Sequence, residues 1–125
     1  MAEGLPEQLP EEKTALTLDH LDLLGRLMND KELAKEVLAV FLDDMPSKIS
    51  ALHAAVESGD AQQIKDQGHT VKGAARNISA QAFQDTAWQL EEAGREGHVD
   101  QAKALLPLLA RQYQDLEKAI REFSG

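Results

Sequence analysis

The chain has no cysteine, and aromatic residues make up only 4% of its 125 residues. The absence of cysteine excludes a disulfide framework, a thiol nucleophile and a zinc–thiolate site, and it fits a reducing compartment. Because strands are enriched in aromatic and β-branched residues, an apolar set dominated by Ala and Leu favours helices. We therefore expect an all-α protein.

Long apolar runs are also missing. No segment approaches the roughly 20 apolar residues of a membrane-spanning helix, and the N-terminus, MAEGLPEQLPEEK, lacks the apolar stretch of a signal peptide. The formal net charge is −9, and an acidic surface repels phosphate backbones and anionic lipid. These features predict a cytoplasmic protein that binds neither nucleic acid nor membrane.

Hydrophobic residues are 42% of the composition, which is enough for the core of one domain. We interpret residues 1–15, which carry two prolines and several glutamates, as a flexible acidic tail, and residues 16–125 as a single domain. A short helix is predicted over 18–27, with Thr17 as its N-cap. The apolar side of this helix is predicted to consist of Leu18, Leu21, Leu24 and Leu27.

Four longer helices are predicted to follow. Asp30 should cap the first of them, and Gly59 and Asp60 should separate it from the next. Proline disfavours helix interiors, so Pro46 is expected to kink or break this first helix, and Pro107 to bend the last one. The apolar stripe of the first long helix is predicted as Leu33, Val37, Val40 or Phe41, Asp44 or Met45, Ile49, Leu52, Ala55 and Val56.

The remaining helices are predicted over 61–78, from a Ser79 N-cap to Gly94 or Gly97, and from Asp100 onwards. Their predicted core positions are Ile64, Val71, Ala75 and Ile78; Phe83, Ala87, Leu90 and Ala93; and Ala104, Leu105, Leu108, Leu109, Tyr113, Leu116 and Ile120. Long helices joined by short loops predict an up-down antiparallel four-helix bundle, with the short N-terminal helix as a lid.

An unusual stretch, QGHTVKG, lies inside the predicted helix 61–78. Gly68 and Gly73 each cost a helix interior roughly 1 kcal/mol relative to alanine. His69 is two residues from the core position Val71, about 200° of helical rotation, so its ring should point away from the core. Three cations share its face: Lys65, Lys72 and Arg76.

Gly73, four residues after His69, removes the side chain that would otherwise crowd the imidazole. The local sequence offers no comparable reason for Gly68. An exposed imidazole with flanking cations and cleared space has what a nucleophilic nitrogen needs to accept and return a phosphoryl group, because such transfer depends on positioning and charge stabilisation.

The pattern His69-x-x-Lys72-Gly73, within GHTVKGAARNISA, resembles the histidine-containing phosphotransfer (Hpt) domain of multistep phosphorelays. The resemblance extends to FLDDMPSKISALHAAVESGD before it and LEEAG after it, over roughly residues 30–120. It implies a four-helix bundle that accepts a phosphoryl group on His69 from a receiver-domain aspartate and passes it to another receiver, as a phosphocarrier without turnover of its own.

The resemblance also implies roles for individual residues. Lys72 would neutralise phosphoryl charge, and Gly73 would admit the receiver. Glu91, 22 positions after His69, would hold Nδ1–H and leave Nε2 as the nucleophile. Two positions depart from the family, which commonly has glycine where Ser79 stands and leucine where Val71 stands.

Receiver domains of response regulators or hybrid histidine kinases are the partners implied by this resemblance. Mg²⁺ would come with the receiver's acidic pocket, and we predict no metal ligand or bound cofactor in this chain. We expect a monomer in which Lys65 and Arg76 contact the partner. Docking is expected on apolar residues around His69, from the helix at 18–27 and the region 41–45.

Several alternatives stay open. Glu91 could instead pair with Arg95 at i+4. The chain could be a helical adaptor in which His69 is incidental, or the phosphotransfer segment of a larger hybrid or chemotaxis-type histidine kinase, although no ATP-binding motif occurs in it. A di-iron carboxylate bundle is excluded, because it needs Glu-x-x-His pairs and the sequence has none.

Overall fold

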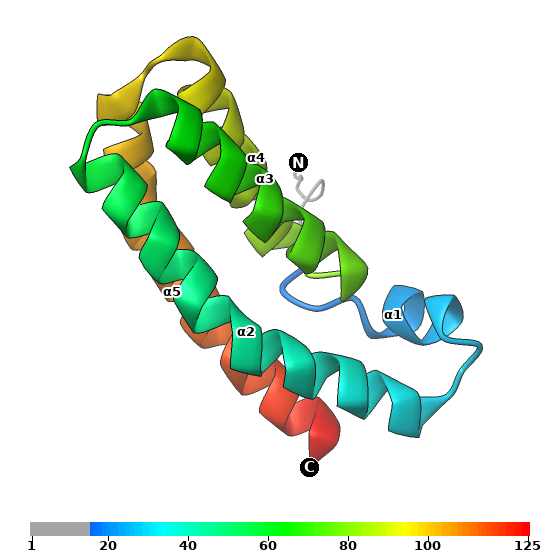
Figure 1. Ribbon diagram of the computed structural model, residues 1–125. Helices are drawn as coiled ribbons and strands as arrows, with labels where there is room; N and C mark the ends of the chain where they lie inside the picture. Colours follow the sequence, from blue (N-terminus) through cyan, green and yellow to red (C-terminus); the bar gives the residue numbers. More distant parts are fainter. Residues whose placement is uncertain (1–15) are drawn as a thin grey trace, which may run out of the picture.

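The computed structural model describes residues 16–125 and contains five helices in that range: α1 His20–Arg26, α2 Lys31–Glu57, α3 Ala61–Asn77, α4 Gln81–Glu96 and α5 Val99–Ser124. No strand occurs among these residues. Figure 1 shows the four long helices as an up-down bundle, in which α3 lies along α4 and α2 lies along α5, with α1 at one end. The predicted fold is therefore confirmed, whereas the predicted acidic tail at 1–15 lies outside the described residues.

Aspartate side chains begin three of the helices by accepting hydrogen bonds from backbone N–H groups of the first turn. Asp30 caps α2 through Leu33 N, as predicted, and Asp60 caps α3. The prediction of Thr17 as the first cap is wrong, because Asp19 holds that position and accepts a bond from Asp22 N.

Ser79 does not cap α4, contrary to the prediction. The N-cap is Ala80, which makes no side-chain cap, and Ser79 itself has a left-handed backbone with φ 61°. This conformation is the one that glycine adopts without strain. The hydroxyl of Ser79 instead donates to Asp22 Oδ2 at 2.5 Å, and the Ser79 carbonyl accepts from Asp19 N, so the turn between α3 and α4 holds the α1 segment.

Both prolines lie inside helices that continue through them. We expected Pro46 to kink or break α2 and Pro107 to bend α5 or end its first part, but α2 runs unbroken to Glu57 and α5 to Ser124. The residues beside the prolines, Met45 and Leu106, are buried. Packing on both sides of each proline therefore outweighs its local cost of about 3 kcal/mol.

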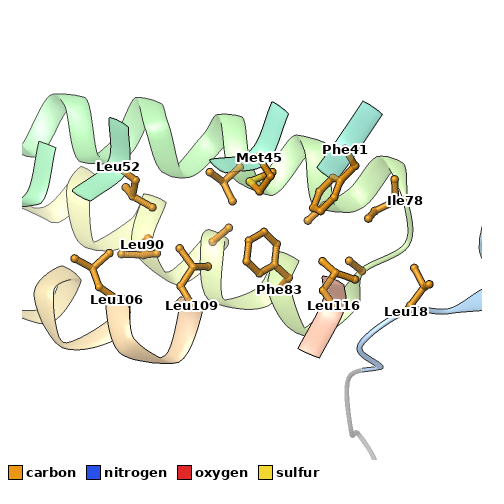
Figure 2. Packing of buried hydrophobic residues seen from close by; sticks show 14 of the residues in the cluster. Leu18, Phe41, Met45, Leu52, Ile78, Phe83, Leu90, Leu106, Leu109 and Leu116 are labelled. Carbon is orange, nitrogen blue, oxygen red and sulfur yellow. The ribbon is translucent and has the colours of Figure 1, made fainter. Parts of the chain in front are cut away.

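The core lies between the four long helices, as Figure 2 shows for Met45, Phe83, Leu90 and Leu109. The predicted core positions of α3 and α4 are all buried. On α2 the stripe is shifted by one residue over its first half and consists of Ala34, Leu38, Phe41 and Met45. On α5 it consists of Ala102, Leu106, Leu109, Leu116 and Ile120.

Some predicted core residues face outwards instead. Leu33 of α2 is 40% exposed, and of the two alternatives Val40 and Phe41 the structure buries Phe41 and leaves Val40 59% exposed. In α1, Leu21 is 85% exposed, while Leu23 is fully buried and anchors the helix on the bundle. Within residues 16–125, no helix is long and apolar enough to cross a membrane.

Candidate functional site around His69

His69 lies in the middle of α3, on the side opposite the core. The core side of α3 buries Ile64, Val71 and Ala75 completely, while the His69 side chain is 67% exposed. The helical period therefore orients the imidazole towards solvent, as the sequence predicts.

Glu91 of α4 lies beside the imidazole, although its carboxylate is almost entirely buried, with 7% of the side chain exposed. Its Oε2 is 3.2 Å from His69 Nδ1 and 3.3 Å from Arg95 Nη2. Its Oε1 is 2.7 Å from Lys72 Nζ, an ion pair that is close but not aligned as a hydrogen bond. The carboxylate thus contacts both His69 and Arg95, which the sequence presented as alternatives.

The charge state of Glu91 follows from these contacts. Burial by itself would raise the pKa of this carboxyl, but the ion pair with Lys72 and the hydrogen bond with His69 outweigh burial and lower the pKa below its ordinary value. At neutral pH Glu91 is therefore a carboxylate, which can only accept hydrogen bonds. The imidazole nitrogen that faces it, Nδ1, must then be the protonated one, and the lone pair of a neutral ring lies on Nε2.

Gly68 has a structural reason that the local sequence does not reveal. A Cβ atom at this position would lie 2.8 Å from the backbone nitrogen of Glu91 and 3.0 Å from its Cα. Gly68 is buried on the side of α3 that meets α4. The glycine therefore lets the two helix backbones approach closely at the level of Glu91.

Gly73 has the opposite environment. A Cβ atom there would have no neighbour within 4 Å, so the space beside it is open. Gly73 and His69 both line a groove of about 440 Å³ between α2 and α3. The other lining residues are Val37, Val40, Phe41, Asp44, Met45 and Lys48 from α2, Thr70, Ala74 and Asn77 from α3, and Ile78, which follows α3. The region 41–45 thus adjoins His69, as expected for a docking surface, whereas no residue of α1 lines this groove.

The two candidate partner-binding cations differ in their surroundings. Lys65 lines a second hollow, of about 470 Å³, together with Asp66, His69, Thr70, Glu91 and Arg95. Arg76 is exposed and lines neither hollow. Arg95 is a member of the site that sequence reasoning did not select, and its only signal was its i+4 spacing from Glu91.

Lys72 forms an ion pair with Glu91 in this structure. The Lys72 side chain is only 16% exposed, because its ammonium group reaches across to the carboxylate on α4. Among residues 16–125 there is no group of three or more His, Cys, Asp or Glu side chains that could hold a metal ion. The site therefore consists of an exposed imidazole whose Nδ1 contacts a buried carboxylate, and the charge of this carboxylate is compensated by Lys72 and Arg95.

Comparison with known proteins gives one consistent family. A family model described as Hpt domain matches residues 36–119. The crystal structure of histidine-containing phosphotransfer protein B (HptB) from Pseudomonas aeruginosa PAO1 is similar, with a TM-score of 0.80 and 27% identity, over 87% of this chain and 95% of HptB.

Two curated relatives are the virulence sensor protein BvgS of Bordetella parapertussis, 28% identical over 101 residues, and that of Bordetella bronchiseptica, 27% identical over 101 residues. Each alignment covers 79% of this chain but only 8% of BvgS. Because the family model spans most of the described bundle, including α3 with His69, the chain belongs to the Hpt domain family, whose members carry out histidine phosphotransfer in phosphorelays.

Proposed function

We propose that His69 is the phosphoacceptor, taking a phosphoryl group on Nε2 from a receiver-domain aspartate and passing it to the aspartate of another receiver. The observation that carries this proposal is the contact between Nδ1 and the Glu91 carboxylate, which leaves Nε2 as the nucleophile on a ring that is 67% exposed. Of the four histidines in the chain, His69 is the one that lines the α2–α3 groove.

The transfer step needs little covalent help from the chain. The Nε2 lone pair attacks phosphorus, the bond from phosphorus to the aspartate oxygen breaks, and the aspartate leaves as a carboxylate. The proton on Nδ1 stays in place, where Glu91 accepts its hydrogen bond and stabilises the positive charge on the ring. The reverse sequence at a second receiver returns the free imidazole, so the chain acts as a phosphocarrier and has no substrate of its own to turn over.

Charge and access are the other requirements. Lys72 and Arg95 compensate Glu91, so their positive charge lies close to the ring on which the phosphoryl dianion forms. We assign Lys72 to stabilising this dianion, and Lys65 and Arg76 to contacting the partner. Mg²⁺ is supplied by the acidic pocket of the receiver. That pocket reaches Nε2 over Gly73, with the apolar residues of the α2–α3 groove beneath it.

A second candidate arrangement is that this sequence works as the phosphotransfer segment of a larger sensor protein. The observation that favours it is that BvgS, a virulence sensor protein by name, aligns with this chain over only 8% of its own length. As a free carrier, the chain would act as a cytoplasmic monomer. Both arrangements use the same chemistry at His69.

Phosphohistidine formation tests the proposal directly. The chain is incubated with a panel of ³²P-phosphorylated receiver domains and Mg²⁺, and the product is tested for label that is stable in base and lost in acid. We expect His69→Gln to abolish this label. His98→Gln is the matched control, because His98 is also exposed but lies at the start of α5, and it should label normally.

Two outcomes would overturn the proposal. Retained label in His69→Gln would move the acceptor to another histidine. Receiver binding that survives His69→Gln, without any phosphohistidine in the wild-type chain, would support the helical-adaptor alternative.

A further inference from the structure

The backbones of α3 and α4 come close together at two positions, and each position is occupied by a glycine. The first of these glycines is Gly68, which faces the backbone of Glu91. One turn further along α4, Gly94 is buried, and a Cβ atom there would lie 2.4 Å from the backbone nitrogen of Lys65 and 2.8 Å from Lys65 Cα and Ala61 O. These distances are far below van der Waals contact, and the neighbouring atoms are backbone, which cannot move aside as a flexible side chain would.

The two glycine contacts lie close to the pair formed by His69 and Glu91. Gly68 directly precedes His69, and its partner across the interface is Glu91 itself. Gly94 lies three residues after Glu91, and its partner Lys65 lies four residues before His69. Residues three and four apart are neighbours on a helix surface, so both close approaches act on the helix turns that carry the imidazole and the carboxylate.

We propose that Gly94 is a positioning residue for phosphotransfer: its missing side chain lets α4 approach α3 closely enough for Glu91 to hold His69 in the tautomer with the proton on Nδ1. The inference rests on the proposed function in that this tautomer makes Nε2 the nucleophile. Gly94 contacts neither His69 nor a receiver, and it acts through the spacing of the two helices.

The expected displacement follows from the contact distances. To bring a Cβ from 2.4 Å to ordinary contact with Lys65 N, the helices must separate locally by on the order of 1 Å. The present Nδ1–Oε2 distance of 3.2 Å is already long for a hydrogen bond, so such a shift carries it beyond the roughly 3.5 Å at which the bond is lost. Lys72 has a flexible stem and can follow the carboxylate, whereas the imidazole has only two side-chain torsions.

Substituting Gly94 with alanine tests the inference, and NMR of the His69 ring nitrogens reports the tautomer directly. Glu91→Ala provides the reference spectrum of a ring without its acceptor. Gly25→Ala is the matched control, because Gly25 also lies inside a helix and a Cβ there would have no neighbour within 4 Å. We expect Gly94→Ala to lose the Nδ1–H tautomer as completely as Glu91→Ala does, while Gly25→Ala keeps the wild-type spectrum.

An unchanged His69 tautomer in Gly94→Ala would overturn the inference. Gly94→Ala is judged unfolded if it loses its helical circular dichroism. In that case the NMR spectrum of the His69 ring nitrogens in Gly68→Ala tests the inference, because the Cβ of this variant would meet Glu91 N at the milder distance of 2.8 Å. An unchanged tautomer there would equally overturn it. The readout needs no phosphoryl donor, so failure of the wild-type chain to form phosphohistidine would count against the proposed function and leave the tautomer result standing.

Discussion

Replacing Lys72 with methionine removes the ammonium group 2.7 Å from Glu91 Oε1 and keeps a side chain of similar length. The Glu91 side chain is 7% exposed, so the variant leaves a nearly buried carboxylate without its closest counter-charge. Methionine also fills most of the volume that the mostly buried lysine side chain occupies. The substitution therefore isolates the charge of Lys72 from its packing.

The magnitude depends on what remains around the carboxylate. Removing one partner of a buried ion pair costs about 3–5 kcal/mol when the other charge is left uncompensated. Here Arg95 and His69 stay on Oε2, so we expect a smaller loss, roughly 1–3 kcal/mol in the free energy of unfolding at pH 7. For a domain of this size that corresponds to a fall in Tm of roughly 4–13 °C.

The pH dependence of this loss has a definite sign. Burial alone would raise the pKa of Glu91, but Lys72 and His69 hold it below its ordinary value of 4.5. A carboxyl with a depressed folded pKa stabilises the fold above its unfolded pKa, and that contribution is lost as pH falls through the folded pKa. In Lys72→Met the folded pKa rises. The stability difference between wild type and variant should therefore be largest near pH 7 and shrink below pH 4.5.

Urea denaturation of both chains at pH 7 and at pH 4 measures this difference. Arg76→Met is the matched control, because it removes the same charge from an exposed position of α3 that has no ion pair among residues 16–125, and it should stay within about 0.5 kcal/mol of wild type. Equal stability of Lys72→Met and wild type at pH 7, or a difference that grows as pH falls, would refute the reasoning. Phosphotransfer measured on the same samples should be slower in Lys72→Met.

The two other predictions concern α1 and Gly73. Leu23→Ala should destabilise the fold by about 2–4 kcal/mol because Leu23 is fully buried. Leu21→Ala, at an 85% exposed position of the same helix, should change stability by no more than about 0.5 kcal/mol. Equal effects of the two substitutions in urea denaturation would contradict the placement of α1. Gly73→Leu should raise helix stability by up to about 1 kcal/mol, since a Cβ atom at this position has no neighbour within 4 Å, and yet block phosphotransfer by filling the space over His69. Gly25→Leu, also in open space, should transfer normally, and undiminished transfer in Gly73→Leu would show that the space is not needed.

The helices and the orientation of His69 could be predicted because they depend on local signals. Aspartate at 30 and 60 begins a helix wherever an apolar periodic segment follows. His69 is 200° from Val71 on any α-helix, so its exposure follows from the helical period alone. The prediction that Glu91 contacts the imidazole came from the family resemblance. Helical periodicity could not have given it, since the two residues lie on different helices.

The register of α2 could not be predicted for a specific reason. This helix has two apolar stripes one residue apart, and both fit a helical period. The structure buries the one with Leu38 and Phe41 in the core, and it leaves Val37 and Val40 to line the groove beside His69. The unbroken course of α2 through Pro46 was equally undetermined, because local propensity says nothing of the packing that outweighs it.

The amino-acid sequence by itself determined that this chain is a helical bundle and that the exposed His69 is flanked by cations and by an open glycine, since each of these properties is set within a few turns of helix. Only the tertiary structure decided which side chains of α4 contact this histidine. The buried carboxylate, the pairing of Lys72 with it, and the reason for Gly68 all depend on how closely α3 approaches α4. That distance is set by the backbones of residues more than 20 positions apart, and no local pattern specifies it.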